Sequence, residues 1–181
     1  ALETSIEELT RLNRIINDML FLAQVSQPQT QVPLKPVNLA DEVTRVSELF
    51  EFSAEQKGIA LRHQGWGTVM ADRLMVQRAL SNLLSNAIRH SPSGHAIDIG
   101  IERCGDALCL WVENRGPGIA QEHLSHLFER FYRAGSGRSR LEGGTGLGLA
   151  IVKSIMQVHR GEVEVRSELN GVTRFSLVFP D

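Results

Sequence analysis

The sequence has few cysteines and few aromatic residues, and it has no long apolar run. Its two cysteines, Cys104 and Cys109, form no CxxC pair and have no matching histidine spacing, which excludes a disulfide framework or an ordinary zinc site. We expect both thiols to fill space in strands. No segment approaches the length of a membrane span, and the first residues lack a signal-peptide pattern. The chain as given is expected to be soluble and to suit a reducing compartment.

Neither sign of charge dominates the composition. Lysine and arginine number 19 against 21 aspartates and glutamates, which gives a net charge of -2 and a pI near 6.3. The whole molecule therefore gives no reason to expect a nucleic-acid partner. A hydrophobic content of 42% is enough for a sizeable core, as one domain with an appended helix.

Three of the six prolines fall in SQPQTQVPLKPVN, which predicts an extended linker over residues 26–37. Residues 1–25 precede it and carry an apolar stripe of helical spacing that is too wide to remain in water. After the linker, Asn38 is a candidate N-cap for a helix that ends near Lys57. This divides the chain into an N-terminal helix, a linker, and a domain over residues 38–181.

The remaining pattern alternates helices with mostly antiparallel strands. Asp72 is a plausible N-cap, and Gly105 with Asp106 joins two alternating runs as a hairpin. We expect helices over 73–90, 121–128 and 147–160, and strands over 59–65, 68–71, 95–104 and 107–114, with two more within 161–179. The fold class is therefore α+β, a two-layer α/β sandwich preceded by a long helix.

The segment NLLSNAIRHS, residues 82–91, carries polar groups beside an apolar stripe. At about 100° per residue, Asn82, Asn86 and Arg89 fall within about 60° of one another. The apolar positions of this helix gather on a separate stripe. One face can pack while the next face offers amides and a cation.

Two glycine-rich segments follow in the sequence. In ENRGPGI, residues 113–119, the glycines allow a sharp turn and a close approach to another group. In GGTGLGLAIVKSI, glycines precede an amphipathic helix whose free N–H groups favour an anion. No GxxxxGK[ST] motif exists, and Leu149 stands where a dinucleotide fingerprint needs its third glycine. The predicted anion site is neither a P-loop nor a Rossmann turn.

Taken in order, NLLSNAIRHS, ENRGPGI, FERFYR and GGTGLGL resemble the N box, first glycine box, F box and second glycine box of the sensor histidine kinase ATP-binding domain. The resemblance covers about residues 36–181 and includes GVTRF near the end. It implies the Bergerat ATP-binding fold, with the N-terminal helix similar to the second helix of a dimerisation and phosphotransfer hairpin. The variant EN sequence is similar to that of some heavy-metal sensor kinases.

The resemblance implies binding of ATP with Mg²⁺, and Asn86 matches the family's metal contact. Asn82 would lie beside it, with Arg89 and His90 reaching phosphate oxygens. A simpler interpretation makes Asn82 a surface residue bonded to a neighbour and His90 a helix-end cation. Core packing also suits the phenylalanines of the lid segment, where Arg138 and Arg140 add positive charge. The other implied ATP-binding residues are Asn114, Gly116, Gly118, Ile119, Phe128, Arg130, Phe131, Arg133, Gly144, Thr145, Gly146, Leu147, Gly148, Leu149 and Thr173.

One position departs from the family pattern DxGxG, because Asn114 replaces the aspartate that accepts a hydrogen bond from the adenine amino group. An amide oxygen can still accept that bond, but a neutral hydrogen bond is typically weaker than a charge-assisted one. The sequence therefore predicts ATP binding of modest affinity.

The resemblance also implies a phosphoacceptor histidine, which these residues do not supply. None of the six histidines lies in the HExxxP-like context of the family's phosphoacceptor, so we expect Mg-ATP binding without self-phosphorylation. For the intact protein, the implied reaction is phosphoryl transfer from ATP to a histidine and then to a response regulator. The implied setting is a homodimer, formed through the N-terminal helix, and the cytoplasmic domain of a bacterial inner-membrane protein. The alternatives are a related ATPase, which would carry a glutamate where Asn82 stands, and a non-catalytic nucleotide-binding module.

Overall fold

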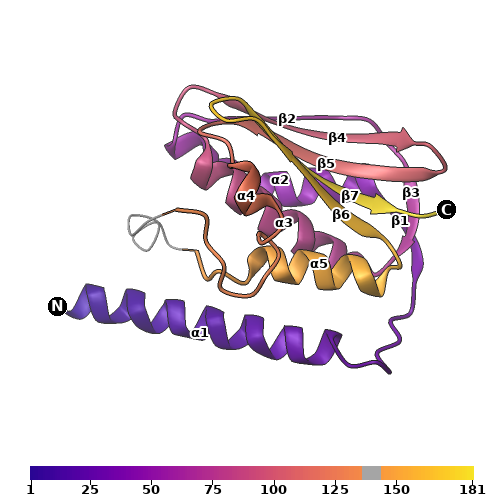
Figure 1. The fold of residues 1–181 in the computed structure, drawn as a ribbon, viewed down its shortest axis with the longest axis horizontal. Coiled ribbons are helices and arrows are strands. Elements are labelled where there is room, and N and C mark those ends of the chain that lie inside the picture. Colours follow the sequence, from indigo (N-terminus) through magenta and orange to yellow (C-terminus); the bar gives the residue numbers. More distant parts are fainter. Residues whose placement is uncertain (136–143) are drawn as a thin grey trace.

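A computed structural model of the chain describes residues 1–135 and 144–181, and a mixed α/β body lies beside a long N-terminal helix (Figure 1). Its main sheet has the order β2-β4-β5-β7-β6, with β2 parallel to β4 and the other pairs antiparallel. These strands are β2 (Ala60–Gln64), β4 (Ala96–Cys104), β5 (Ala107–Arg115), β6 (Glu162–Ser167) and β7 (Val172–Phe179). A separate two-stranded sheet pairs β1 (Lys35–Asn38) with β3 (Thr68–Ala71).

The helices form the second layer of the body. They are α1 (Leu2–Val25), α2 (Leu39–Gln56), α3 (Arg73–His90), α4 (Gln121–Leu124) and α5 (Gly148–Val158). Helices α2, α3 and α5 cover one face of the sheet, and α1 lies beyond α5 (Figure 1). The predicted two-layer α/β sandwich with a preceding long helix is confirmed.

The core lies between the sheet and helices α3 and α5. Alternating strand residues point to this side, since one face of the sheet packs while the other faces water. The side chains with 0% exposure here include Ile97, Ile99, Leu110 and Leu177 from the sheet and Leu80, Leu84 and Ile151 from the helices. Full burial of one such side chain contributes about 1.5–3 kcal/mol, so the sheet fixes which face of α3 turns inward.

Side-chain caps determine where two helices begin. The Asn38 side-chain oxygen accepts hydrogen bonds from the backbone N–H groups of Ala40 and Asp41, at 3.0 and 3.3 Å. The Asp72 carboxylate accepts one from the Met75 N–H at 2.9 Å. Each bond satisfies a donor that the first helical turn leaves unpaired. Both predicted N-caps are confirmed.

Two local expectations differ from the structure. Residues 35–37, expected within the linker, belong to strand β1, where Pro36 pairs opposite Met70. Proline is tolerated there because a two-stranded sheet leaves an edge that needs no N–H donor. The helix expected over 121–128 ends at Leu124 and continues as turns, since Leu127 and Phe128 turn toward the core.

The two cysteines lie in the β4–β5 hairpin as expected from the strand pattern. Cys109 is buried, whereas Cys104 is exposed at the end of the hairpin, so the expectation that both thiols fill space is wrong for Cys104. Burial, with a smaller contribution from the neighbouring Cys104, raises the pKa of the Cys109 thiol to about 12. The Cys109 thiol therefore stays protonated near neutral pH, which suits a residue that fills space.

Helix α1 contacts the body through the C-terminal part of its length. Leu22 and Val25 are buried, and the Asp18 carboxylate accepts a hydrogen bond from the Arg78 guanidinium of α3 at 3.0 Å. The Arg78 guanidinium also lies 4.0 Å from the centroid of the Phe21 ring. These contacts hold α1 beside α3 and α5.

The other face of α1 is apolar and exposed. Its large exposed side chains are Leu2, Ile6, Leu9, Leu12, Ile16, Met19 and Leu20. A contiguous exposed apolar patch of this kind is typical of an interaction surface. Over the described ranges, no helix has both the length and the apolarity that a bilayer span requires.

Gly100 offers a test of packing on the outer face of the sheet. A Cβ added there would lie 2.0 Å from Cζ2 of Trp111, and the Arg174 guanidinium already stacks on that ring at 3.8 Å. We predict that Gly100→Ala lowers the free energy of unfolding by about 1–3 kcal/mol in denaturant titrations, because the indole must move. In a Trp111→Leu background the same substitution should have a smaller effect. An equal effect in both backgrounds would show that the ring is not the cause.

The Asp18–Arg78 ion pair provides a test of how α1 docks. Asp18→Asn should weaken a partly buried ion pair by about 1 kcal/mol, so amide exchange over residues 18–25 should accelerate about fivefold. Hydrogen-exchange mass spectrometry measures this directly. The exposed Glu7 of the same helix gives the matched control, since Glu7→Gln should leave the exchange of residues 18–25 unchanged. Equal exchange in wild type and Asp18→Asn would contradict the docking contact.

Candidate functional site

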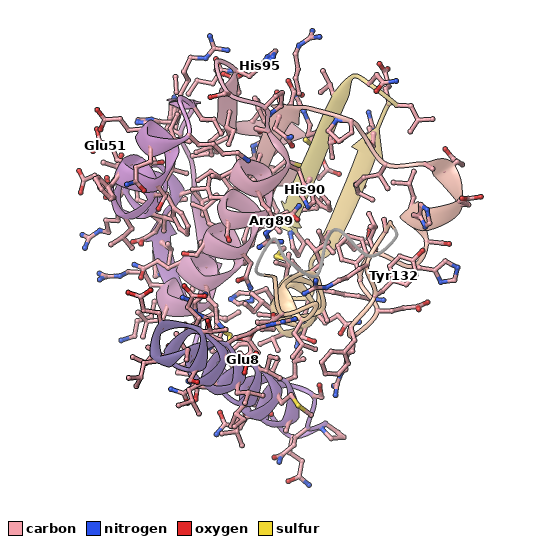
Figure 2. The ribbon with its side chains drawn as sticks, turned by 90° about the vertical axis from the view of Figure 1, so that its left-hand side faces the viewer. Glu8, Glu51, Arg89, His90, His95 and Tyr132 are labelled. Carbon is pink, nitrogen blue, oxygen red and sulfur yellow. The ribbon has the colours of Figure 1, made fainter. Side chains whose placement is uncertain are left out.

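One cavity of about 590 Å³ lies between α3, the start of α5, the ends of β5 and β7, and one side of α1. Figure 2 shows Arg89 and His90 in the middle of the molecule, with Tyr132 to their right. All three residues line this cavity. The predicted site residues that line it are Asn82, Asn86, Arg89, His90, Asn114, Gly118, Ile119, Arg133, Gly144, Thr145, Gly146, Gly148, Leu149 and Thr173.

Helix α3 provides the polar wall of the cavity. Asn82 and Asn86 lie one turn apart on the face next to the buried stripe, as the 3.6-residue period predicts. The Asn82 amide donates a hydrogen bond to the Gly148 carbonyl oxygen at 3.2 Å. Asn82 therefore joins α3 to the first turn of α5 in addition to lining the cavity.

The Arg89 guanidinium lies against the glycine-rich loop. Its Nη1 atom would be 2.8 Å from a Cβ added at Gly144, and its Nη2 atom lies 3.5 Å from the Ser85 hydroxyl. A Cβ at Gly144 would displace the end of the Arg89 side chain from this position. The arrangement places a fixed positive charge beside the backbone that leads into α5.

The glycine-rich loop also connects to the segment before it. The Phe131 N–H donates to the Gly146 carbonyl oxygen at 2.8 Å, and Gly146 has φ +77, a left-handed conformation that favours glycine. The Leu147 N–H donates to the Thr145 hydroxyl at 3.3 Å. These bonds order the entrance to α5, whose N-terminus carries the partial positive charge of the helix dipole.

The opposite wall is built from the ends of β5 and β7. Asn114 is 7% exposed and stands opposite Thr173 in the strand register. The Thr173 hydroxyl is 2.6 Å from the Ser167 hydroxyl, which accepts a hydrogen bond from the Ile119 N–H at 2.8 Å. An amide and a hydroxyl therefore lie side by side above apolar walls formed by Ile119 and Phe175.

The glycine turn after β5 allows this wall to meet α3. A Cβ at Gly116 would lie 2.5 Å from the His90 carbonyl oxygen, and one at Gly118 would lie 2.1 Å from the Glu168 carbonyl oxygen. Gly118 also has φ +73. Both positions exclude a side chain, as the sequence pattern indicates.

Some predicted site residues do not line the cavity. Leu147 has 0% exposure and belongs to the core. Phe128 is half-buried and packs against the core, with its ring edge-on to Phe175 at 6.2 Å between ring centroids. Arg130 and Phe131 are exposed on the segment before the loop, so the expected core packing is wrong for Phe131. Gly116 packs against the His90 carbonyl oxygen at the end of α3. Arg138 and Arg140 lie outside the described residues.

Helix α1 contributes residues that the sequence did not indicate. Arg14, Asn17 and Asp18 line the cavity, and the Thr145 hydroxyl donates to the Asp18 carboxylate at 3.1 Å. Their i, i+3, i+4 spacing marks one polar face of α1. That spacing does not reveal where the face docks. Ser85, Pro117, Leu127, Tyr132, Ala134 and Phe175 complete the additional lining.

The donor groups of this cavity suit a hard cation shared with an anionic ligand. The described residues contain no cluster of three or more histidine, cysteine, aspartate or glutamate side chains that could hold a metal by themselves. Mg²⁺ commonly takes one or two protein oxygens and completes its shell with phosphates and water. The Asn86 amide oxygen fits that mode, since Asn86 lies on the cavity wall beside Asn82.

Comparison with known proteins gives a family for this fold and cavity. The model for the histidine kinase-, DNA gyrase B-, and HSP90-like ATPase family matches residues 71–181. Sensor histidine kinase CusS of Escherichia coli K12 is 47% identical over 180 residues, covering 99% of this chain and 37% of that protein. Sensor protein CzcS of Cupriavidus metallidurans is 40% identical over 178 residues, covering 98% of this chain and 37% of that protein.

Solved structures agree with this relationship. Full-length ShkA, determined in complex with AMPPNP, is 27% identical with a TM-score of 0.83, covering 99% of this chain and 37% of that chain. The catalytic domain of histidine kinase ThkA is 28% identical with a TM-score of 0.71, covering 82% of this chain and 96% of that domain.

The chain spans 37% of the length of the two curated relatives described here. The family match includes α3, the glycine-rich loop and both strands that form the opposite wall. The chain therefore belongs to the histidine kinase-, DNA gyrase B-, and HSP90-like ATPase family and contains the ATP-binding catalytic domain of a sensor histidine kinase.

Proposed function

We propose that the cavity binds ATP together with Mg²⁺ and presents the γ-phosphoryl group to a histidine on a dimerisation hairpin, for relay to a response regulator. The observation that carries this proposal is the convergence of three features on one cavity. These are the amide and guanidinium face of α3, the glycine-rich entrance to α5, and the Asn114–Thr173 wall.

The triphosphate belongs at the positive end of this cavity. The N-terminus of α5 supplies backbone N–H groups and a favourable dipole for anionic oxygens. Arg89, on the neighbouring helix, adds a permanent positive charge that can form paired hydrogen bonds to phosphate. His90 and Arg133 line the same cavity and would serve the outer phosphates.

Asn86 would hold the metal through its amide oxygen, with Asn82 beside it. When bound, Mg²⁺ neutralises charge on the transferring phosphates, as in other phosphoryl transfers. The protein's contribution is to position the nucleotide and to exclude a competing water. The base would lie at the Asn114–Thr173 wall, between Ile119 and Phe175.

The scarcity of carboxylates among the described lining residues favours a kinase over a related ATPase. Among the described lining residues the only carboxylate is Asp18, and Arg78 and Thr145 both donate to it. At the position where the ATPases carry a glutamate, Asn82 donates to a backbone carbonyl. Within the part of the chain that the structure describes, no lining carboxylate is therefore placed to activate a water, which supports transfer to a protein acceptor.

The rest of the assembly follows from α1 and the relatives. The exposed apolar face of α1 suits a four-helix bundle between two subunits. We therefore assign residues 1–25 to the second hairpin helix. Because strand β1 pairs with β3, we assign 26–34 to the linker and 35–181 to the catalytic domain. We further infer a cytoplasmic domain of an inner-membrane bacterial sensor in the heavy-metal-responsive subgroup.

Asn86→Ala tests the metal contact. We predict that calorimetric affinity for a non-hydrolysable ATP analogue with Mg²⁺ falls at least about tenfold, because an oxygen ligand is lost. Removing Mg²⁺ with EDTA should reduce wild-type affinity to a similar level and leave the variant nearly unchanged. The exposed Asn13 of α1 provides the control, since Asn13→Ala should bind like wild type. Retained metal dependence in Asn86→Ala would refute the assignment.

Phosphotransfer separates the kinase proposal from its alternatives. With labelled ATP and a separate histidine-bearing hairpin, we predict an acid-labile label on the hairpin and none on a hairpin whose histidine is replaced by glutamine. Release of inorganic phosphate without the hairpin would indicate an ATPase. ATP binding with neither outcome would indicate a non-catalytic nucleotide module.

A further inference from the structure

We propose that the Asn114–Thr173 wall accepts 6-oxopurine nucleotides as well as adenine nucleotides. Both of these side chains can act either as donor or as acceptor toward the nucleotide base. This inference rests on the proposed function, in which the nucleotide base meets Asn114 and Thr173. It extends the substrate class of the cavity from ATP to nucleoside triphosphates with a carbonyl at the same ring position.

The chemistry of Asn114 is the first support. A carboxylate at this position could only accept hydrogen bonds, so it would face the 6-oxygen of a 6-oxopurine with two acceptors opposed. An amide presents one oxygen acceptor and one N–H₂ donor. A half-turn of the Asn114 amide therefore exchanges the group offered to the base.

Only a weak hydrogen bond opposes this half-turn of the Asn114 amide in the structure. Its amide nitrogen donates to the neighbouring Arg115 carbonyl oxygen at 3.4 Å, which is long for a hydrogen bond and is correspondingly weak. Glu113, the adjacent residue in β5, pairs with Arg174 at 2.7 Å next to the Trp111 ring. That pair lies on the outer face of the sheet, so it places no charge at the Asn114–Thr173 wall.

The second support comes from Thr173, which stands opposite Asn114 in the register. Its hydroxyl is 2.6 Å from the Ser167 hydroxyl, and either oxygen can be the donor. The Ile119 N–H occupies only one acceptor site of the Ser167 oxygen. Thr173 can therefore donate to the base while Ser167 donates to Thr173, or accept from the base while Thr173 donates to Ser167.

The two reversals match the two purine edges. Adenine offers a donor at its exocyclic amine and an acceptor at ring nitrogen N1, whereas a 6-oxopurine offers an acceptor at O6 and a donor at N1–H. Asn114 and Thr173 are neighbours on adjacent strands. The group on carbon 6 and ring nitrogen N1 are likewise neighbours on the purine. The wall can satisfy either edge without leaving a buried polar group unpaired, which is the usual source of strong discrimination.

Calorimetric titration of the whole chain with Mg-ATP, Mg-ITP and Mg-GTP tests this inference. Inosine carries the 6-oxo group without the 2-amino group of guanine, so ITP tests polarity and GTP adds the effect of size. We predict that the dissociation constant for ITP is within about tenfold of that for ATP, against the far larger ratios of one-directional sites. Asn114→Asp should raise the ratio of the ITP to the ATP dissociation constant at least about tenfold. The variant should bind ATP as tightly as wild type or more tightly. Asn13→Asp makes the same charge change outside the site and should leave the ratio unchanged.

The outcomes separate this inference from the proposed function. If wild type binds ATP but ITP more than about tenfold weaker, the inference is wrong while ATP binding stands. An unchanged ratio in a folded Asn114→Asp protein also overturns the role of Asn114. If wild type binds no nucleotide, the proposed function is wrong and the inference fails with it. The wild-type ratio decides the matter even if Asn114→Asp does not fold.

Discussion

Burial of the apolar stripe of α3 against the sheet is the constraint on which the cavity depends. Leu80 and Leu84 have no exposure, so α3 cannot rotate about its axis without moving them into water. Because the amide face follows the buried stripe by a fixed helical angle, Asn82 and Asn86 are held at the cavity wall. The positions of the polar groups are thus a consequence of packing.

The same packing connects parts of the site that are distant in the sequence. The Asn82 amide joins α3 to α5 through the Gly148 carbonyl, and the β5–β7 register places Asn114 beside Thr173. Glycines at the turns permit approaches that a Cβ would block, as at Gly116 against the end of α3. A nucleotide in this cavity would contact a helix face, a helix N-terminus and two strand ends at once.

Local signals made most of the fold predictable from the sequence. Asn38 and Asp72 begin helices through bonds to nearby N–H groups, and such caps are readable without tertiary information. The polar face of α3 follows from helical spacing in the same way. Strand β1 was missed because four residues that include Pro36 carry little periodicity, and pairing with β3 forms it.

The rest of the site depends on tertiary contacts. Arg14 and Asn17 reach the cavity because α1 docks through its buried Leu22 and Val25 and the Asp18–Arg78 ion pair. Nothing local in α1 encodes these partners. Leu147 and Phe128 lie within the family motifs, yet Leu147 is buried in the core and the half-buried Phe128 packs against it. A motif identifies a segment, whereas packing decides which of its side chains face the cavity.

The central claim is that one nucleotide spans the α3 face and the Asn114 wall. Side-chain amide signals in NMR spectra test it most directly, since asparagines lie at both places. On titration with Mg-ATP, the signals of Asn82, Asn86 and Asn114 should shift together with a single dissociation constant, while that of Asn13 stays unchanged. Shifts at only one wall, or at none in a folded sample, would contradict the account.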